Sequence, residues 1–281
     1  MRQKDGAKRW ISLGFISFQP SEVAKIGLII FFASLLTKNK ERLGEMWKGF
    51  FYPIIFLLPI IGILVGVQNH LSATLLIVMI VSVMMLMAGS KLRYFLTFGI
   101  AGATTGLSAL FLYAKITQKG LFRITRLITF LDPFADIQGS GWQVVQSLYA
   151  IGSGGLFGVG LGNSTQKYLY IPEAHNDFIF SIIAEELGFL GCVFVIALFA
   201  LFIWRGILIA IKAPDMFGSL IAAGVTTMVG LQAIINIAVV TSSMPNTGMP
   251  LPFFSYGGTS LLILMASVGI LLNISRASKT K

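Results

Sequence analysis

Acidic groups and a histidine gather directly before the longest apolar segment of the chain. Glu173, His175 and Asp177 belong to the sequence PEAHNDF, and an apolar run begins at residue 178. A carboxylate in this position can act as a general base at a membrane surface, taking the proton of an attacking hydroxyl group. Aspartate at a helix start is also a favoured N-cap, so position alone leaves a catalytic and a structural role for Asp177 equally open.

Cationic side chains lie in the same polar stretch. Arg123 and Arg126 are three residues apart, so on a helical segment they share one face, and Lys167 follows further along. Two guanidinium groups on one face can bind a phosphate or pyrophosphate through paired hydrogen bonds. The alternative is that they are ordinary charges of a long loop, since long loops cross a membrane whatever their charge.

Charged groups also occur within apolar segments, where they are costly. Glu22 and Lys25 stand at i and i+3 at the start of the first apolar segment, so they can pair on one helical face. Such a pair either shapes a catalytic cavity or holds helices together. Glu185 and Glu186 lie about two helical turns into the segment that follows Asp177, and must face protein or a water-filled cavity.

Other familiar sites are excluded by spacing. Six glycines between residues 152 and 162 fit no nucleotide-binding loop, and close helix packing or a re-entrant segment in the membrane accounts for them better. His70 and His175 are too few and too far apart for a zinc site. No order of serine, histidine and aspartate indicates covalent catalysis. The single cysteine, Cys192, excludes an internal disulfide.

The elements that must position these groups are membrane-spanning helices. Hydrophobic residues make up 56% of the 281, charged residues only 11%, and the mean hydropathy is +0.84. Soluble domains carry about 25% charged residues, so we expect the chain to cross a membrane several times. The net charge of +10 is scattered among loops and forms no basic stripe, so no nucleic-acid partner is expected.

Seven apolar segments have lengths suited to membrane-spanning helices, which need about 20 residues. They cover residues 23–37, 50–67, 71–88, 94–114, 178–204, 216–241 and 258–274. Lys and Arg follow every second segment, which predicts that these ends and the C-terminus lie in the cytoplasm. The sequence therefore predicts an all-α polytopic membrane protein, one domain over residues 1–281, with a large extracellular loop at about 115–177.

Short motifs occur in order along nearly the whole chain. They are GAKRWI at 6–11, FQPSE at 18–22, AK at 24–25, GWQ at 141–143, QS at 146–147, QK at 166–167, PEAHNDF at 172–178, AEELG at 184–188 and SYGG at 255–258. Together with Arg123, Arg126 and Asp132–Pro133, which match the large outer loop, they resemble the SEDS family (shape, elongation, division and sporulation), the group of FtsW, RodA and SpoVE. The ending APDMFG…NISRASK looks closest to the sporulation branch.

The resemblance implies a ten-helix fold, of which the first three helices are expected to be absent from this chain. It also implies a peptidoglycan glycosyltransferase that polymerises lipid II at the outer face of the cytoplasmic membrane, for cell division, cell shape or spore cortex synthesis. The family's essential aspartate corresponds to Asp177. It would deprotonate the acceptor sugar, which displaces undecaprenyl pyrophosphate with inversion.

The resemblance further implies the surroundings of this base. Arg123, Arg126 and Lys167 would stabilise the leaving pyrophosphate, with or without a divalent cation (Mg or Mn), and no organic cofactor is expected. The Glu22–Lys25 pair would support the cavity. The implied partners are lipid II, a class B penicillin-binding protein and membrane lipid. Substrate contacts are also expected from a further set of polar residues: Gln143, Gln146, Ser147, Glu173, His175 and Ser255.

Two other functions stay open from the sequence. A polar cavity with Glu and Lys inside the membrane would also suit a lipid II flippase, and a non-catalytic scaffold for a penicillin-binding protein would need Asp177 only as a cap. The gathering of polar residues on one side favours the enzyme. One departure from the family pattern is Gln68–Asn69–His70–Leu71, which stands where the family usually has Gln-Pro-Asp-Leu, so the turn or polar contact there is expected to differ.

Overall fold

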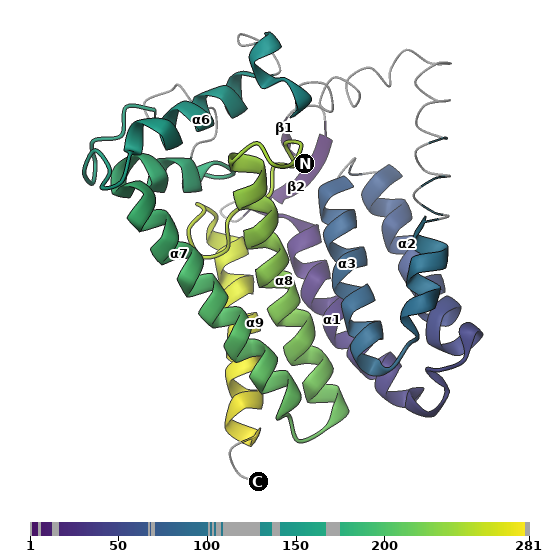
Figure 1. Ribbon diagram of the computed structural model, residues 1–281. Helices are drawn as coiled ribbons and strands as arrows, with labels where there is room; N and C mark the ends of the chain where they lie inside the picture. Colours follow the sequence, from purple (N-terminus) through teal and green to yellow (C-terminus); the bar gives the residue numbers. More distant parts are fainter. Residues whose placement is uncertain are drawn as a thin grey trace. The chain divides into compact units, whose positions relative to one another are not determined.

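The described part of the chain forms two compact units. Unit 1 comprises Met1–Thr97, Leu201–Leu231 and Gly257–Lys281, and unit 2 comprises Phe98–Ala200 and Gln232–Tyr256. The computed structural model (Figure 1) describes residues 2–4, 7–12, 17–66, 68, 71–100, 102, 104, 108, 130–136, 141–166 and 175–278.

Six helices among the described residues are long and apolar enough to cross a membrane. The predicted helical, polytopic membrane fold is therefore confirmed, while most of the expected segment 94–114 lies outside the described residues. The spans are α1 (Pro20–Lys38), α2 (Tyr52–Gly66) with the turn Trp47–Phe51 before it, α3 (Leu71–Ala88), α7 (Ile179–Ile211), α8 (Met216–Val240) and α9 (Gly258–Ser278).

A small antiparallel sheet precedes α1 and was not expected from the sequence. Its order is β1-β2-β3, with Arg2 opposite Trp10 and Ile11 opposite Phe18. The strands are β1 (Arg2–Lys4), β2 (Ala7–Ser12) and β3 (Ser17–Phe18). This stretch contains Arg2, Lys4, Lys8 and Arg9 and is too basic to form a membrane helix, and pairing of neighbouring extended segments satisfies main-chain groups instead.

Helix α1 is central to unit 1. Pro20 stands at its first position, where the missing N–H is no loss, and Lys38 in the last turn suits the negative end of the helix dipole. Helices α2, α3 and α9 pack against it (Figure 1). Gly224 lets α8 approach closely, since a Cβ at this position would lie 2.7 Å from Ile29 of α1 and 3.0 Å from Met84 of α3.

In unit 2, a glycine-rich loop lies directly against α7. The loop follows α6 (Trp142–Gly154), and Gly188, with φ of +67°, interrupts α7 beside it. The N–H groups of Val159 and Gly160 donate to the Glu185 and Glu186 carbonyls over 2.9 and 3.1 Å. In return, the N–H of Phe189 donates to the Gly155 carbonyl over 2.8 Å. The loop thus replaces helical hydrogen bonds that the break at Gly188 removes.

Close packing, predicted for the six glycines between residues 152 and 162, is confirmed for Gly154 and Gly158. An added Cβ at Gly154 would overlap the Ala184 carbonyl, and one at Gly158 would overlap the Glu186 carbonyl. Gly188 faces the Gly158 main chain in the same way. Only a residue without a side chain permits two backbones to come this near. Packing against α7 therefore accounts for Gly154 and Gly158 without a bound nucleotide.

We expect Gly158→Ala to destabilise the protein more than Gly162→Ala. Both glycines have positive φ, +79° and +83°, so alanine costs each about 1–2 kcal/mol of backbone strain. Only Gly158 lies against another backbone, whereas Gly162 has no atom within 4 Å of an added Cβ. Overpacking at Gly158 should add about 1–3 kcal/mol. Thermal unfolding of the two purified variants in detergent measures the difference, and equal melting temperatures would contradict the packing argument.

Candidate functional site

The turn that carries Asp177 precedes α7. We call residues 175–178 the aspartate turn; α7 begins at Ile179, directly after it. His175 is exposed, and Asn176 and Asp177 are half-buried. The carbonyl of Phe178 accepts hydrogen bonds from the main-chain N–H and the hydroxyl of Ser181 over 3.1 and 2.6 Å, which closes the first turn of α7.

The other three carbonyls of the aspartate turn are bound from outside it. Donors come from α8 and from residues 241–256, which contain Pro245, Pro250 and Pro252 and are called the proline loop. The His175 carbonyl accepts the N–H of Tyr256 over 2.8 Å. The Asn176 carbonyl accepts the Ser255 hydroxyl over 2.5 Å, and that hydroxyl accepts the N–H of Leu251 over 2.7 Å. Thus a loop more than 70 residues away in sequence fixes the turn.

The third of these carbonyls belongs to Asp177 itself. It accepts a hydrogen bond from the Nδ2 of Asn236, over 2.7 Å, and the same nitrogen donates to the Met249 carbonyl over 2.7 Å. Asn236 is 1% exposed and lies on α8. Asn236 was not among the residues predicted from the sequence. The sequence does contain an indication of its role, because an amide within the apolar stretch AIINIAVV is costly unless it has a hydrogen-bond partner.

The Asp177 carboxylate lies against a residue that has no side chain. A Cβ added to Gly248 would be 3.2 Å from the Oδ2 of Asp177, and Gly248 has φ of +64°. Nearby, Phe253 has φ of +68°, which is unusual for a bulky residue and indicates local strain. Strain of this kind concentrates at functional sites when the surroundings hold it in place. Gly248 and Phe253 therefore help to shape the proline loop, and Gly248 lies beside Asp177.

Predicted substrate-binding residues on α6 join this arrangement. Gln143 accepts a hydrogen bond from the amide of Asn246 in the proline loop over 3.0 Å. Ser147 is fully buried and donates its hydroxyl to the Val240 carbonyl over 2.8 Å, while Gln146 is also buried. These contacts give Gln143, Ser147 and Ser255 roles in holding α6, α8 and the aspartate turn together. Their direct contact with a substrate stays a prediction.

Glu185 of α7 binds the segment before Lys167. Its carboxylate is 1% exposed and accepts hydrogen bonds from the Ser164 hydroxyl over 2.5 Å, and from the N–H and hydroxyl of Thr165 over 3.0 and 2.9 Å. The expectation that Glu185 faces protein is confirmed. Several donors to one carboxylate offset the loss of water around the buried charge. Glu185 therefore fixes the chain immediately before Lys167.

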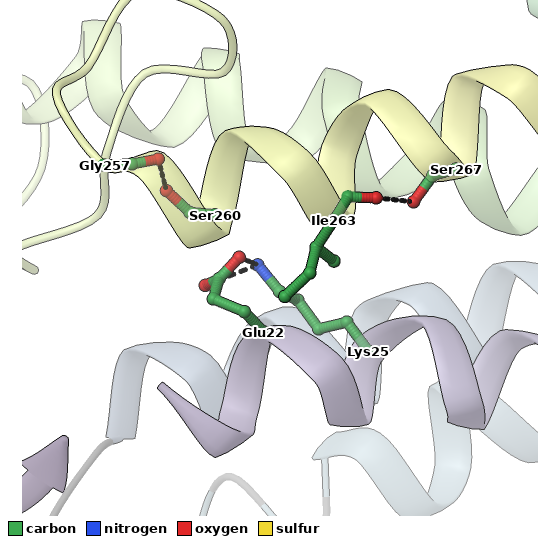
Figure 2. A network of polar contacts seen from close by, with 6 residues as sticks. All are labelled: Glu22, Lys25, Gly257, Ser260, Ile263 and Ser267. Carbon is green, nitrogen blue, oxygen red and sulfur yellow. Dashed lines mark hydrogen bonds and ion pairs between the residues drawn. The ribbon is translucent and has the colours of Figure 1, made fainter. Parts of the chain in front are cut away.

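Glu22 and Lys25 form the ion pair that their spacing predicts, within unit 1. The Lys25 ammonium lies 2.8 Å from each carboxylate oxygen, and the two side chains are 3% (Lys25) and 17% (Glu22) exposed. Figure 2 shows the pair on the side of α1 that faces α9, near Ser260 and Ile263. The Ser260 hydroxyl donates within α9, to the Gly257 carbonyl over 2.9 Å. The role of the pair in supporting a catalytic cavity stays a prediction.

Four of the predicted site residues lie outside the described residues: Arg123, Arg126, Lys167 and Glu173. Their roles therefore stay predictions, as does the altered turn at Asn69–His70, which the structure does not describe either. In the described ranges, no group of three or more His, Cys, Asp or Glu could hold a metal ion. Magnesium is often held by one or two carboxylates together with substrate phosphates, so Asp177 fits a divalent cation only if the substrate supplies further oxygens.

The chain matches known proteins over nearly its whole length. The model of the family described as cell cycle protein, FTSW_RODA_SPOVE, matches residues 1–280. Stage V sporulation protein E of Bacillus subtilis (strain 168) is 42% identical over 276 residues, which are 98% of this chain and 73% of that protein. The probable peptidoglycan glycosyltransferase FtsW of Geobacter sp. (strain M18) is 43% identical over 270 residues, 96% of this chain and 71% of that one.

Solved structures show the same fold. A chain from work described as "Structural coordination of polymerization and crosslinking by a peptidoglycan synthase complex" superimposes with a TM-score of 0.81 and 31% identity, covering 100% of this chain and 76% of that one. The rod shape determining protein RodA of Thermus thermophilus gives a TM-score of 0.66 and 30% identity, covering 98% and 71%.

We expect Glu185→Ala to loosen residues 164–166. The substitution removes the acceptor of the buried Ser164 hydroxyl and of the Thr165 N–H and hydroxyl, which should lower the free energy of unfolding by about 1–3 kcal/mol. Glu185→Gln keeps one acceptor oxygen and should lose less. Glu41→Ala is the matched control, because Glu41 is exposed and should change stability by less than about 0.5 kcal/mol. Thermal unfolding and the rate of limited proteolysis measure the effect, and unchanged proteolysis in Glu185→Ala would contradict it.

Proposed function

This chain belongs to the FtsW, RodA and SpoVE family of cell cycle proteins, and from that premise we propose that it is a peptidoglycan glycosyltransferase which polymerises lipid II into glycan strands. It is a polytopic membrane protein, and its relatives include proteins named for this activity. The observation that carries the proposal is the aspartate turn. A half-buried carboxylate stands beside a glycine on a turn whose four carbonyls all accept hydrogen bonds, as a fixed general base would.

Asp177 takes one proton in the proposed reaction. The 4-hydroxyl of the GlcNAc unit of the acceptor loses its proton to the Asp177 carboxylate as its oxygen attacks the anomeric carbon of the donor's MurNAc. The new carbon–oxygen bond forms while the bond to the lipid pyrophosphate breaks, and undecaprenyl pyrophosphate leaves with the electron pair. One displacement inverts the α-linkage to β. This direct route needs one positioned base and no covalent intermediate.

The leaving pyrophosphate needs positive charge. Arg123, Arg126 and Lys167 are proposed to supply it, because guanidinium groups bind phosphate oxygens in pairs and such donors stabilise the charge that develops in the transition state. The contacts of Glu185 support a role for Lys167, since its carboxylate binds Ser164, Thr165 and, through an N–H at 3.4 Å, Gln166 directly before it. A divalent cation bound to the pyrophosphate would add positive charge at the same place.

The orientation in the membrane and the partner protein are proposed from the charge pattern and from the relatives. We place the aspartate turn and the proline loop on the extracytoplasmic side and the C-terminus in the cytoplasm, because Lys and Arg follow alternate spans. A class B penicillin-binding protein is the proposed partner, whose transpeptidase would cross-link the new strand. The similarity to a chain of a peptidoglycan synthase complex that joins polymerization with crosslinking supports this pairing.

We expect Asp177→Asn to lower glycan synthesis from purified lipid II by about 100-fold or more, because an amide cannot accept the proton. Asp215→Asn is the matched control: Asp215 lies in the turn before α8, where its carboxylate accepts the N–H of Gly218 over 3.4 Å, and this variant should polymerise normally. Gel analysis of labelled lipid II products measures both. Full activity of Asp177→Asn would exclude Asp177 as the general base. Movement of lipid II across the membrane of vesicles that contain the protein, without polymer formation, would favour a flippase.

We expect Arg123→Gln and Arg126→Gln each to lower the rate of polymerisation by about 100-fold, as loss of one donor to the developing charge does in other enzymes. Arg42→Gln is the control, because Arg42 is exposed on the short helix Lys40–Arg42 and should leave the rate unchanged. The same assay with a chelator, then with added Mg²⁺ or Mn²⁺, tests for a cation. If both arginine variants keep the wild-type rate, their proposed contact with the pyrophosphate is wrong.

A further inference from the structure

We infer that Asn236 is a positioning residue for the glycosyl transfer, acting through the main chain of Asp177. The inference rests on the proposed function, because it assigns Asn236 a role only in holding the proposed base. The Asn236 amide donates to both the Asp177 carbonyl and the Met249 carbonyl. We infer that this shared donor keeps the Asp177 carboxylate beside Gly248.

The geometry of the amide requires asparagine. Its Nδ2 carries two protons and donates to two carbonyl oxygens, both at 2.7 Å. Aspartate at this position has the same shape but, when ionised, only acceptors, so it would place a charge against two carbonyls. Alanine has no donor at all. No residue of similar size other than asparagine offers two N–H donors on one atom at this distance from the helix.

Asn236 differs from the other groups that hold the aspartate turn. Tyr256 and Ser255 bind the carbonyls of His175 and Asn176, whereas Asn236 binds the carbonyl of the proposed base itself. Its Oδ1 is buried and accepts no hydrogen bond within the described residues. An unpaired buried acceptor offsets part of the stability that the two donated bonds provide. The amide therefore matters more for where Asp177 lies than for the stability of α8.

Position matters because a general base must come within hydrogen-bond reach of the proton that it removes. A displacement of about 1 Å can lower a rate about 100-fold. The Asp177 carboxylate has Gly248 on one side, and the Cα from which it extends is held through the carbonyl that Asn236 binds. Loss of the amide removes the donor that the Asp177 and Met249 carbonyls share. One constraint on the distance between the carboxylate and Gly248 is then lost, while Tyr256 and Ser255 still bind the rest of the turn.

The test combines kinetics with hydrogen–deuterium exchange on the full chain in detergent, with lipid II as substrate. Asn236→Ala and Asn236→Asp should each lower kcat about 100-fold while KM stays within about two-fold. Exchange should become faster in peptides that contain residues 175–178 and 249–251. Gln232→Ala is the matched control, because it removes another buried amide one turn earlier on α8 and should keep kcat and the exchange of both peptides.

Gly248→Ala places a new side chain against the Asp177 carboxylate. It provides a second test if neither Asn236 variant folds. Its new Cβ would lie 3.2 Å from the Oδ2 of Asp177, and the φ of +64° adds backbone strain in the alanine variant, so kcat should fall at constant KM. Normal kcat in folded Asn236→Ala or, failing that, in Gly248→Ala would overturn the inference, as would unchanged exchange in a folded Asn236 variant.

The two proposals fail in different ways. If Asp177→Asn polymerises lipid II at the wild-type rate, Asp177 is not the general base, and Asn236 then has no base to position. If Asp177→Asn is inactive while Asn236→Ala keeps its kcat, the proposed function stands and only the role of Asn236 is overturned.

Discussion

Main-chain carbonyl groups in apolar surroundings need donors, and this need shapes unit 2. Without water, an unpaired carbonyl is costly, so irregular backbone persists only where other groups bind it. The aspartate turn meets the requirement with all four of its carbonyls, using Tyr256, Ser255, Asn236 and Ser181. These hydrogen bonds hold the main chain of the aspartate turn and so fix the position from which the Asp177 side chain extends.

The same requirement explains the break in α7. Gly188 interrupts the helix, and the loop after α6 supplies hydrogen bonds to the carbonyls of Glu185 and Glu186 and accepts them from Phe189 and Leu190. Because the main chains must come very close to do this, the loop contains glycine where it touches α7. The Glu185 side chain then binds Ser164 and Thr165, so one helix break organises the chain up to residue 166. The hydrogen bonds from the loop therefore replace those that the break at Gly188 removes from α7.

Many features could be predicted from residue type and spacing. Six of the seven predicted apolar segments correspond to α1, α2, α3, α7, α8 and α9, since length and hydropathy are local properties of the chain. The pairing of Glu22 with Lys25 follows from helical periodicity alone. The sheet of β1, β2 and β3 was not predicted, because short basic strands carry little periodic signal. Asn236 was missed because its partners, Asp177 and Met249, lie 59 and 13 residues away.

The sequence by itself determined the class of the protein, its apolar spans, its family motifs and the identity of the acidic group before α7. Each of these depends on residues that are near one another in the chain. Only the tertiary structure decided what holds that group: Asn236 on α8, Ser255 and Tyr256 from the proline loop, and Gly248 beside the carboxylate. The physical reason is that a carbonyl accepts a hydrogen bond from whichever donor folding brings near. Spacing along the chain does not encode which distant donor this will be.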